Sequence, residues 1–151
     1  MIHYRNAARA RDVNSRALVA SAKRLLAAVG EEDASLSLSV VNDDEMRAIN
    51  RSHRGKDRST DVLSFSIDGE TGTPASANAP ERLLGDVVIS VETARRQAAD
   101  YDATLQDELY RLLIHGLLHV LGHDHERADE RRIMQREERR LAGAIGLETA
   151  G

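Results

Sequence analysis

The stretch HGLLHVLGHDH, residues 115–125, contains four of the six histidines of this 151-residue chain. Residues four apart lie on one face of a helix, so His115 and His119 are expected to project together. Gly122 follows, and glycine readily takes the left-handed conformation that ends a helix, which lets the chain turn back and return His125 to the same point. Three neutral imidazoles leave a fourth tetrahedral position for water, as in catalytic zinc sites. The spacing therefore predicts one zinc ion bound by His115, His119 and His125.

Two neighbours of these histidines, His123 and Asp124, are not expected to bind the metal. His123 lies two residues before His125 and could compete for the metal, but it is expected outside the coordination sphere. Asp124 is expected to orient a ligand or the turn, since ligating imidazoles usually donate their second N–H to a carboxylate or carbonyl. A single histidine on an apolar helix is more often a hydrogen-bonded core residue, but two without partners would each cost about 1–3 kcal/mol. Metal ligation explains the pair better.

The order of the histidines is also the ligand spacing of the extended zinc-protease motif. In those proteases the residue after the first histidine is a glutamate that acts as general base. This chain has Gly116 there, which cannot accept a proton. Met134 is a candidate for the downstream methionine turn of such proteases, but its charged helical context favours packing. A zinc protease is the weaker alternative.

A second candidate site is the stretch RAINRSHRGKDR, residues 47–58. Asp57 is its one acidic residue, against the cations Arg47, Arg51, Arg54, Lys56 and Arg58. An arginine fork matches a phosphate bidentately and a lysine offers a point charge, so this patch beside a metal would attract a phosphodiester. Composition alone favours an ordinary solvated loop.

The composition limits the class of protein. A 41% hydrophobic and 30% charged content argues against disorder, and the length suits a single domain, predicted to span residues 1–151. The net charge of −4 gives no general attraction to nucleic acid. Because cysteine is absent, a metal would have to bind imidazole or carboxylate. The start lacks the apolar run of a secretion signal, and no stretch is apolar enough to span a bilayer, which predicts a cytoplasmic protein without a membrane partner.

Short alternating stretches predict a β-sheet. In SLSLSVV, residues 35–41, apolar residues alternate with serines, which marks a half-buried strand. Two more strands are predicted over 60–67 and 85–91. The segment between them, 68–84, contains both prolines and has no period, so a long loop is predicted there.

Helical periodicity predicts the remaining elements: 12–29, about 43–51 with a capping-box-like start at Asn42, and 91–101 capped by Ser90. A further helix begins after Thr104 and is apolar nearly all round from Leu112 to Leu121, so it is expected to be central and buried. This is the helix that carries the histidine pair. Strands mixed with helices in one small domain predict an α+β or mixed α/β fold.

The tail, residues 126–146, is predicted to be a helix laced with charges. Acidic residues alternate with its arginines, so a solvated face is favoured over an RNA-binding one. The residues predicted to pack inward are Ile133, Met134, Leu141 and Ile145.

The histidine stretch resembles the H-G-x-L-H-x-x-G-[YH]-D-H signature of the YbeY family, bacterial single-strand-specific metallo-endoribonucleases linked to ribosomal RNA maturation. RGKDRSTDVLSF, residues 54–65, and LLGDVVIS, residues 83–90, are also similar to that family. With similar order and length, the resemblance covers nearly the whole chain. The family usually has proline where this chain has Ser66, and tyrosine is commoner at the position of His123.

The resemblance implies an α+β fold with helices packed on a mixed sheet, zinc ligation by His115, His119 and His125, and a functional arginine at Arg54. For Lys56 and the other cations the loop interpretation stands. The resemblance also implies a zinc-dependent endoribonuclease of single-stranded ribosomal RNA, acting in 16S rRNA 3′-end maturation, ribosome biogenesis and quality control. Ribosomal small-subunit proteins are further expected partners.

The predicted reaction is metal-assisted phosphodiester cleavage, with Arg54 stabilising the charge that develops on phosphorus. Asp61 and Asp86 stand near the ends of predicted strands and are interpreted as structural. Single-strand binders commonly stack bases on aromatic side chains, and this chain has one Phe, three Tyr and no Trp, so binding is expected to depend on phosphate charge and on salt. The alternatives are a zinc metalloprotease-like hydrolase and a non-catalytic ribosome-assembly factor.

Overall fold

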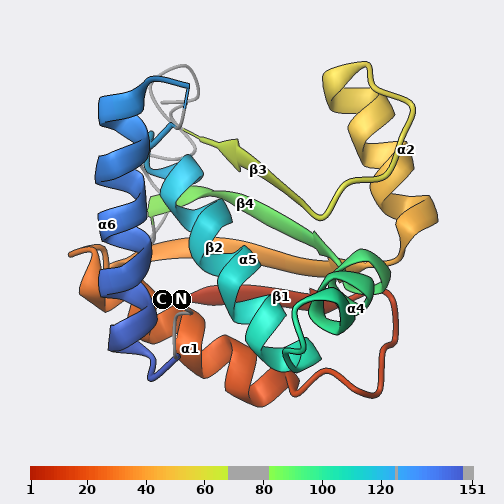
Figure 1. The fold of residues 1–151 in the computed structure, drawn as a ribbon, viewed down its shortest axis with the longest axis horizontal. Helices are drawn as coiled ribbons and strands as arrows, with labels where there is room; N and C mark the ends of the chain where they lie inside the picture. Colours follow the sequence, from red (N-terminus) through yellow and green to blue (C-terminus); the bar gives the residue numbers. More distant parts are fainter. Residues whose placement is uncertain (68–81, 125, 148–151) are drawn as a thin grey trace.

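A mixed β-sheet is the frame of the protein in the computed structural model, which describes residues 1–67, 82–124 and 126–147. Its strands are β1 (Ile2–Asn6), β2 (Ala34–Val41), β3 (Val62–Ser66) and β4 (Arg82–Ser90). The spatial order is β1-β2-β4-β3; the first three strands are parallel, and β3 pairs antiparallel with β4 at one edge (Figure 1). The sheet with its packed helices confirms the predicted α+β class.

The described helices are α1 (Ser15–Ala28), α2 (Asp43–Arg54), α4 (Val91–Asp100), α5 (Leu105–Val120) and α6 (Ala128–Ala144). Three of them begin at the predicted caps, because the side chains of Asn42, Ser90 and Thr104 each accept a hydrogen bond from the backbone N–H three residues later. The first helix begins later than predicted, since Asn14 caps it.

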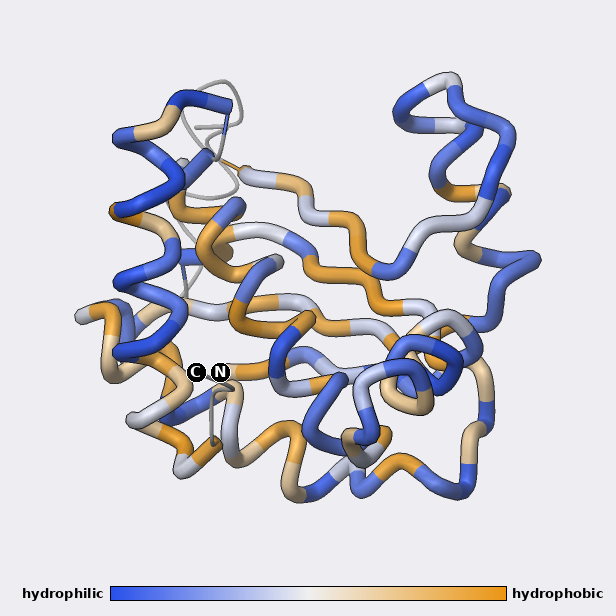
Figure 2. The backbone as a smooth tube through the Cα atoms, viewed as in Figure 1, coloured by the Kyte–Doolittle hydropathy of each residue, from blue (hydrophilic) through white to orange (hydrophobic). Residues whose placement is uncertain are grey.

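The main core lies between one face of the sheet and the helices α1, α5 and α6. The apolar residues of β2 that alternate with serine point into this core and are fully buried, as predicted: Leu36, Leu38 and Val40. Helix α5 crosses this face and is the central buried helix that the sequence predicts (Figure 1). Figure 2 shows apolar residues along both α5 and the strands behind it.

A smaller cluster on the opposite face of the sheet fixes α2. Met46 of α2 is fully buried there against Val41, Leu63 and Val88. Helix α5 therefore belongs to the main core, whereas Met46 of α2 packs in the cluster on the opposite face of the sheet. Figure 1 shows α2 at one end of the sheet, leading into β3.

The sequence prediction missed β1. Only Ile2 and Tyr4 supply its alternation, charged or polar residues separate them, and the strand lies at the edge of the sheet where burial is partial. Its pairing partner β2, which is distant in the chain, determines it: Ile2 stands opposite Leu36. Such a short edge strand depends on tertiary pairing more than on its own pattern.

The prediction was also wrong at Ile133, which is 49% exposed, while Met134 and Leu141 are buried in the core. A residue adjacent to Met134 is rotated by about 100° around the helix and cannot share its stripe. The predicted loop 68–84 was too long, since β4 begins at Arg82; its residues 68–81 lie outside the described residues. Within the described part of the chain, no helix has the length and apolar character needed to cross a membrane.

Strand β3 is tied to α5 by Ser66, whose hydroxyl donates a hydrogen bond to the backbone carbonyl of Val120 at 2.9 Å. That carbonyl belongs to the last turn of the helix, where carbonyls lack helical partners. We expect Ser66→Ala to lower the free energy of unfolding by about 1 kcal/mol. In a thermal melt this corresponds to a Tm lower by roughly 2–4 °C.

Ser66→Thr is the matched control for this prediction, because it keeps the hydroxyl on a strand that favours β-branched residues. Its Tm should stay at the wild-type value. Equal losses in the alanine and threonine variants would show that the bond to Val120 does not stabilise the protein.

Candidate metal centre

The histidine pair lies on α5 as the spacing predicts. The Nε2 atoms of His115 and His119 are 3.1 Å apart, and the two rings meet at 70° with centroids 4.6 Å apart. Both side chains are partly buried. The positions of the two rings follow from the helix alone, because one turn separates them.

The donor set of this pair fits a zinc ion. Two zinc–nitrogen bonds of about 2.0–2.1 Å at the tetrahedral angle place their nitrogens about 3.3 Å apart. The separation of 3.1 Å between the imidazole nitrogens is close to this value. The pair can therefore supply two ligands to one ion with little change in either side chain.

The end of α5 turns as the sequence predicts. Gly122 adopts φ of 96°, its N–H donates to the carbonyl of His119 at 3.0 Å, and the N–H of His123 donates to that of Leu118 at 2.9 Å. These are the two hydrogen bonds of a Schellman motif, which reverses the chain direction at the end of a helix. The turn stands directly after the second predicted ligand.

The third predicted ligand, His125, lies outside the described residues. In the remainder, residues 1–67, 82–124 and 126–147, no group of three or more His, Cys, Asp or Glu is placed to hold a metal ion. His123 is partly buried and does not line the cavity described next. It lies near α6, where a hydrogen bond from Arg140 lowers the pKa of Glu137 and His123 contributes a smaller electrostatic lowering.

A cavity of about 290 Å³ opens beside the histidine pair, at β3, the last strand of the described sheet. The end of α2, the chain that follows it, strand β3 and helix α5 all contribute to the lining of this cavity, here called the His–Arg cavity. The lining residues are Asn50, Arg54, Lys56, Arg58, Thr60, Asp61, Val62, Leu63, Ser64, His115 and His119.

Arg54 is the last residue of α2 and reaches over the edge of β3. Its Nη2 donates to the carbonyl of Ser64 at 3.2 Å, and its guanidinium carbon lies 5.7 Å from the centroid of the Phe65 ring, within range of a cation–π contact. Gly55 then ends the helix in the left-handed conformation, with φ of 68°. The structure thus brings Arg54 to the same cavity as His115 and His119.

The cation-rich stretch divides into two groups. Arg47 forms a bidentate pair with Asp57, at 2.8 and 3.1 Å, and does not line the cavity. Lys56 and Arg58 do line it beside Arg54. The sequence interpretation of these two as ordinary loop residues missed their place at the cavity, and no local pattern signals it, because the chain after Arg54 is neither helix nor strand.

Asp61 also lines the cavity, but its carboxylate is engaged in the fold. Its Oδ1 accepts from the backbone N–H of Val62 at 2.8 Å, and its Oδ2 accepts from Nε2 of Gln97 at 3.3 Å. Its carbonyl accepts from the N–H of Ser90 at 2.9 Å. These contacts join the start of β3 to β4 and α4, which agrees with a structural carboxylate.

Gly116 is glycine because α5 approaches the sheet closely. A Cβ at this position would lie 2.7 Å from Cγ1 of Val87 and 3.2 Å from Cγ2 of Val62. The position next to the first histidine therefore faces the buried side of the helix, and a glutamate there would enter the core instead of the cavity. The close packing of α5 on the sheet therefore explains why this chain has no glutamate at the position of the zinc-protease base.

The histidine pair and the three cations at one cavity are groups that suit a metal-dependent hydrolase acting on a phosphodiester. A family model described as endoribonuclease YbeY matches residues 3–146. The chain belongs to the YbeY family of endoribonucleases.

Relatives in this family are similar over most of the chain. The endoribonuclease YbeY of Pelotomaculum thermopropionicum is 44% identical over 131 residues, which span 86% of this chain and 85% of that protein. That of Anaeromyxobacter dehalogenans is 48% identical over 133 residues, spanning 88% of this chain but 65% of the relative. The solution structure of a Thermotoga maritima protein shares the fold, with a TM-score of 0.66 at 24% identity over 96% of this chain and 89% of that one.

Proposed function

We propose that a zinc ion held by His115, His119 and His125, together with the guanidinium of Arg54, forms the centre at which this endoribonuclease cleaves single-stranded ribosomal RNA. The observation that carries the proposal is the shared cavity: Arg54 and two of the three histidines come from different elements and line the same space.

The residues of this chain divide the proposed work between them. The imidazoles hold one ion per chain, which when bound supplies a Lewis acid and lowers the pKa of a coordinated water. Arg54 donates to the phosphate oxygens as negative charge develops on them. Lys56 and Arg58 line the same cavity and attract the backbone of the substrate to it.

The position of the cavity favours a single strand. The histidines are partly buried, so a phosphodiester must enter between α5 and the end of α2 to approach them. A flexible strand can bend into such a space, whereas the backbone of a duplex is held on a rigid helix. We also propose that the chain acts as one domain in the cytoplasm, on the 3′ end of 16S rRNA during ribosome biogenesis, in contact with small-subunit proteins.

The test compares three substrates after the metal content has been measured. Zinc-loaded protein should contain one ion per chain, cleave single-stranded RNA, spare duplex RNA and leave casein intact. A chelator should remove the ion and abolish cleavage, and added zinc should restore cleavage, because neutral imidazoles bind the ion reversibly.

Each alternative gives a different result in this test. Cleavage of casein without cleavage of RNA would identify a metalloprotease. RNA cleavage that persists after complete removal of the metal would contradict the proposed centre. A ribosome-assembly factor without catalysis would bind its ribosomal partner equally well with and without the ion and cleave neither substrate.

A further inference from the structure

The segment 56–61, from Lys56 to Asp61, connects α2 to β3 and supplies four residues to the lining of the His–Arg cavity. It is neither helix nor strand. A regular hydrogen-bond ladder therefore does not fix its conformation, and the positions of its cations depend on individual contacts with neighbouring elements.

Contacts from the middle of α2 fix two residues of the segment. Asn50, which is 2% exposed, donates from Nδ2 to the carbonyl of Arg58 at 2.8 Å. Arg47 pairs with Asp57, but both side chains are more than half exposed, so this pair contributes little. A further, more buried contact holds Ser59.

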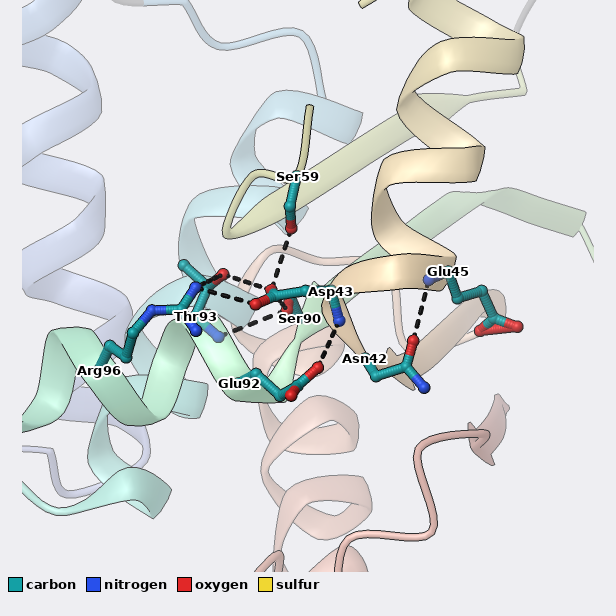
Figure 3. A network of polar contacts seen from close by, with 8 residues as sticks. All are labelled: Asn42, Asp43, Glu45, Ser59, Ser90, Glu92, Thr93 and Arg96. Atoms are coloured by element: carbon teal, nitrogen blue, oxygen red, sulfur yellow. Dashed lines mark hydrogen bonds and ion pairs between the residues drawn. The ribbon is translucent and has the colours of Figure 1, made fainter. Parts of the chain in front are cut away.

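That contact comes from Asp43, the first residue of α2, which joins three parts of the protein (Figure 3). Its Oδ1 accepts from the hydroxyls of Ser59 at 3.0 Å, Ser90 at 2.6 Å and Thr93 at 2.7 Å. Its Oδ2 lies 3.0 Å from Nη2 of Arg96. One carboxylate thus connects the segment 56–61, the end of β4 and the first turns of α4.

We propose that Asp43 is a positioning residue: through Ser59 it holds the segment 56–61 in the conformation that lines the His–Arg cavity. The carboxylate touches no residue of the cavity lining directly in the contacts above; it acts on the cations through the backbone of the segment. The consequence for cleavage rests on the proposed function, whereas the effect on the segment does not.

The charge of Asp43 is suited to this role. Burial raises the pKa of Asp43, but the hydrogen bonds of the three hydroxyls and the guanidinium outweigh it and bring the pKa to about 2. The N-terminus of α2 also favours a negative charge. Because the pKa is lowered, the ionised carboxylate of Asp43 stabilises the folded protein fully above about pH 4, the ordinary range of an aspartate. This stabilisation is lost as the pH falls through about 2. Asp43 should therefore add no pH dependence to cleavage between about pH 5 and 9.

The first measurement follows the segment itself, by native-state trypsin cleavage after Lys56. Ser59→Ala removes the contact with Asp43 and leaves the other three partners of the carboxylate in place. We expect cleavage of the Lys56–Asp57 bond to become about tenfold faster, the factor expected for losing one hydrogen bond to a charged group. Ser59→Thr keeps the hydroxyl and should restore the wild-type rate.

Asp12→Ala is the matched control. Asp12 also pairs with an arginine of α4, accepting from Arg95 at 2.9 and 3.0 Å. Neither of these two hydrogen bonds involves the segment 56–61. Trypsin cleavage after Lys56 should be unchanged in this variant. A rate that rises equally in Asp12→Ala and Ser59→Ala would mean that general loosening, and not the Asp43–Ser59 contact, exposes the segment.

The second measurement is steady-state cleavage of single-stranded RNA by the zinc-loaded protein. Ser59→Ala should lower kcat/KM about tenfold, mainly through a higher KM, with an unchanged pH profile; a 1 Å displacement of binding groups can cost up to roughly 100-fold. Asp43→Asn also weakens the contacts with Ser90, Thr93 and Arg96, so it should lower kcat/KM at least as much. The double variant should be no worse than Asp43→Asn alone, because Ser59 acts through the carboxylate that this variant has already lost.

The two measurements separate the possible failures. Unchanged trypsin cleavage in Ser59→Ala, or additive effects in the double variant, would overturn the positioning role of Asp43. Faster trypsin cleavage in a protein whose wild type cleaves no RNA would support the role in holding the segment and count against the proposed function.

Discussion

Arg54→Ala is expected to lower kcat/KM for single-stranded RNA by about 10²–10³, while the bound zinc stays at the wild-type level. The guanidinium donates charge-assisted hydrogen bonds to a phosphate whose charge grows in the transition state, which is why its loss affects the rate so strongly. Arg54 lines the cavity from α2, whereas His115 and His119 lie on α5, so removal of the arginine should leave these two proposed ligands in place.

Two contacts of Arg54 explain why lysine should not replace it. The hydrogen bond to the Ser64 carbonyl uses one of the five N–H donors of the guanidinium, and the Phe65 ring supports its plane, so the remaining donors keep a fixed direction. A lysine ammonium retains the charge but not the fork. Arg54→Lys should recover less than a tenth of the lost activity, a deficit of roughly 1.4 kcal/mol or more in transition-state binding.

The controls for this prediction are Arg51→Ala and His119→Ala. Arg51 is an exposed arginine on the same helix that does not line the cavity, so its removal should change kcat/KM less than threefold, as a rim charge does. His119→Ala should lose both zinc and activity. If Arg54→Ala lost zinc as well, its role would be to hold the metal site together, and the phosphate-binding role would be wrong.

The parts of the site that the sequence predicts are the local ones. The one-turn spacing of His115 and His119 and the left-handed glycine at 122 depend on short-range geometry, and the structure contains both. The same holds for the caps at Asn42, Ser90 and Thr104, each of which bonds within its own first turn. Local rules of this kind need no knowledge of the tertiary fold.

The parts that sequence reasoning missed depend on contacts between distant segments. Lys56 and Arg58 belong to the cavity because the segment 56–61 is held between α2 and β4. Asp43 contacts Ser90 and Thr93, which lie 47 and 50 residues away in the chain. Strand β1 exists because β2 offers a partner edge. Neither periodicity nor charge pattern contains these pairings, since both describe neighbours in the chain.

Gly116→Glu, which would restore the glutamate of the zinc-protease motif, is expected to unfold the protein instead of creating a protease. Even a Cβ at 116 would lie 2.7 Å from Val87, a β-branched side chain that has little freedom to move. The rest of the glutamate would then have to enter the core between α5 and the sheet, where an unpaired carboxylate costs several kcal/mol. A natural domain has a stability of only about 5–15 kcal/mol. Circular dichroism and a thermal melt should show loss of the cooperative transition near the wild-type Tm.

Gly143→Glu provides the matched control, since Gly143 is also a helical glycine but is exposed, and a Cβ there meets nothing within 4 Å. Gly143 is the next-to-last residue of α6, where glutamate gains helix propensity over glycine but faces the negative end of the helix dipole, so the Tm should stay near the wild-type value. The contrast between the two substitutions isolates packing from helix propensity. A folded Gly116→Glu protein that cleaves casein would show that position 116 can face the metal, and the explanation of the missing base by close packing of α5 on Val87 and Val62 would be wrong.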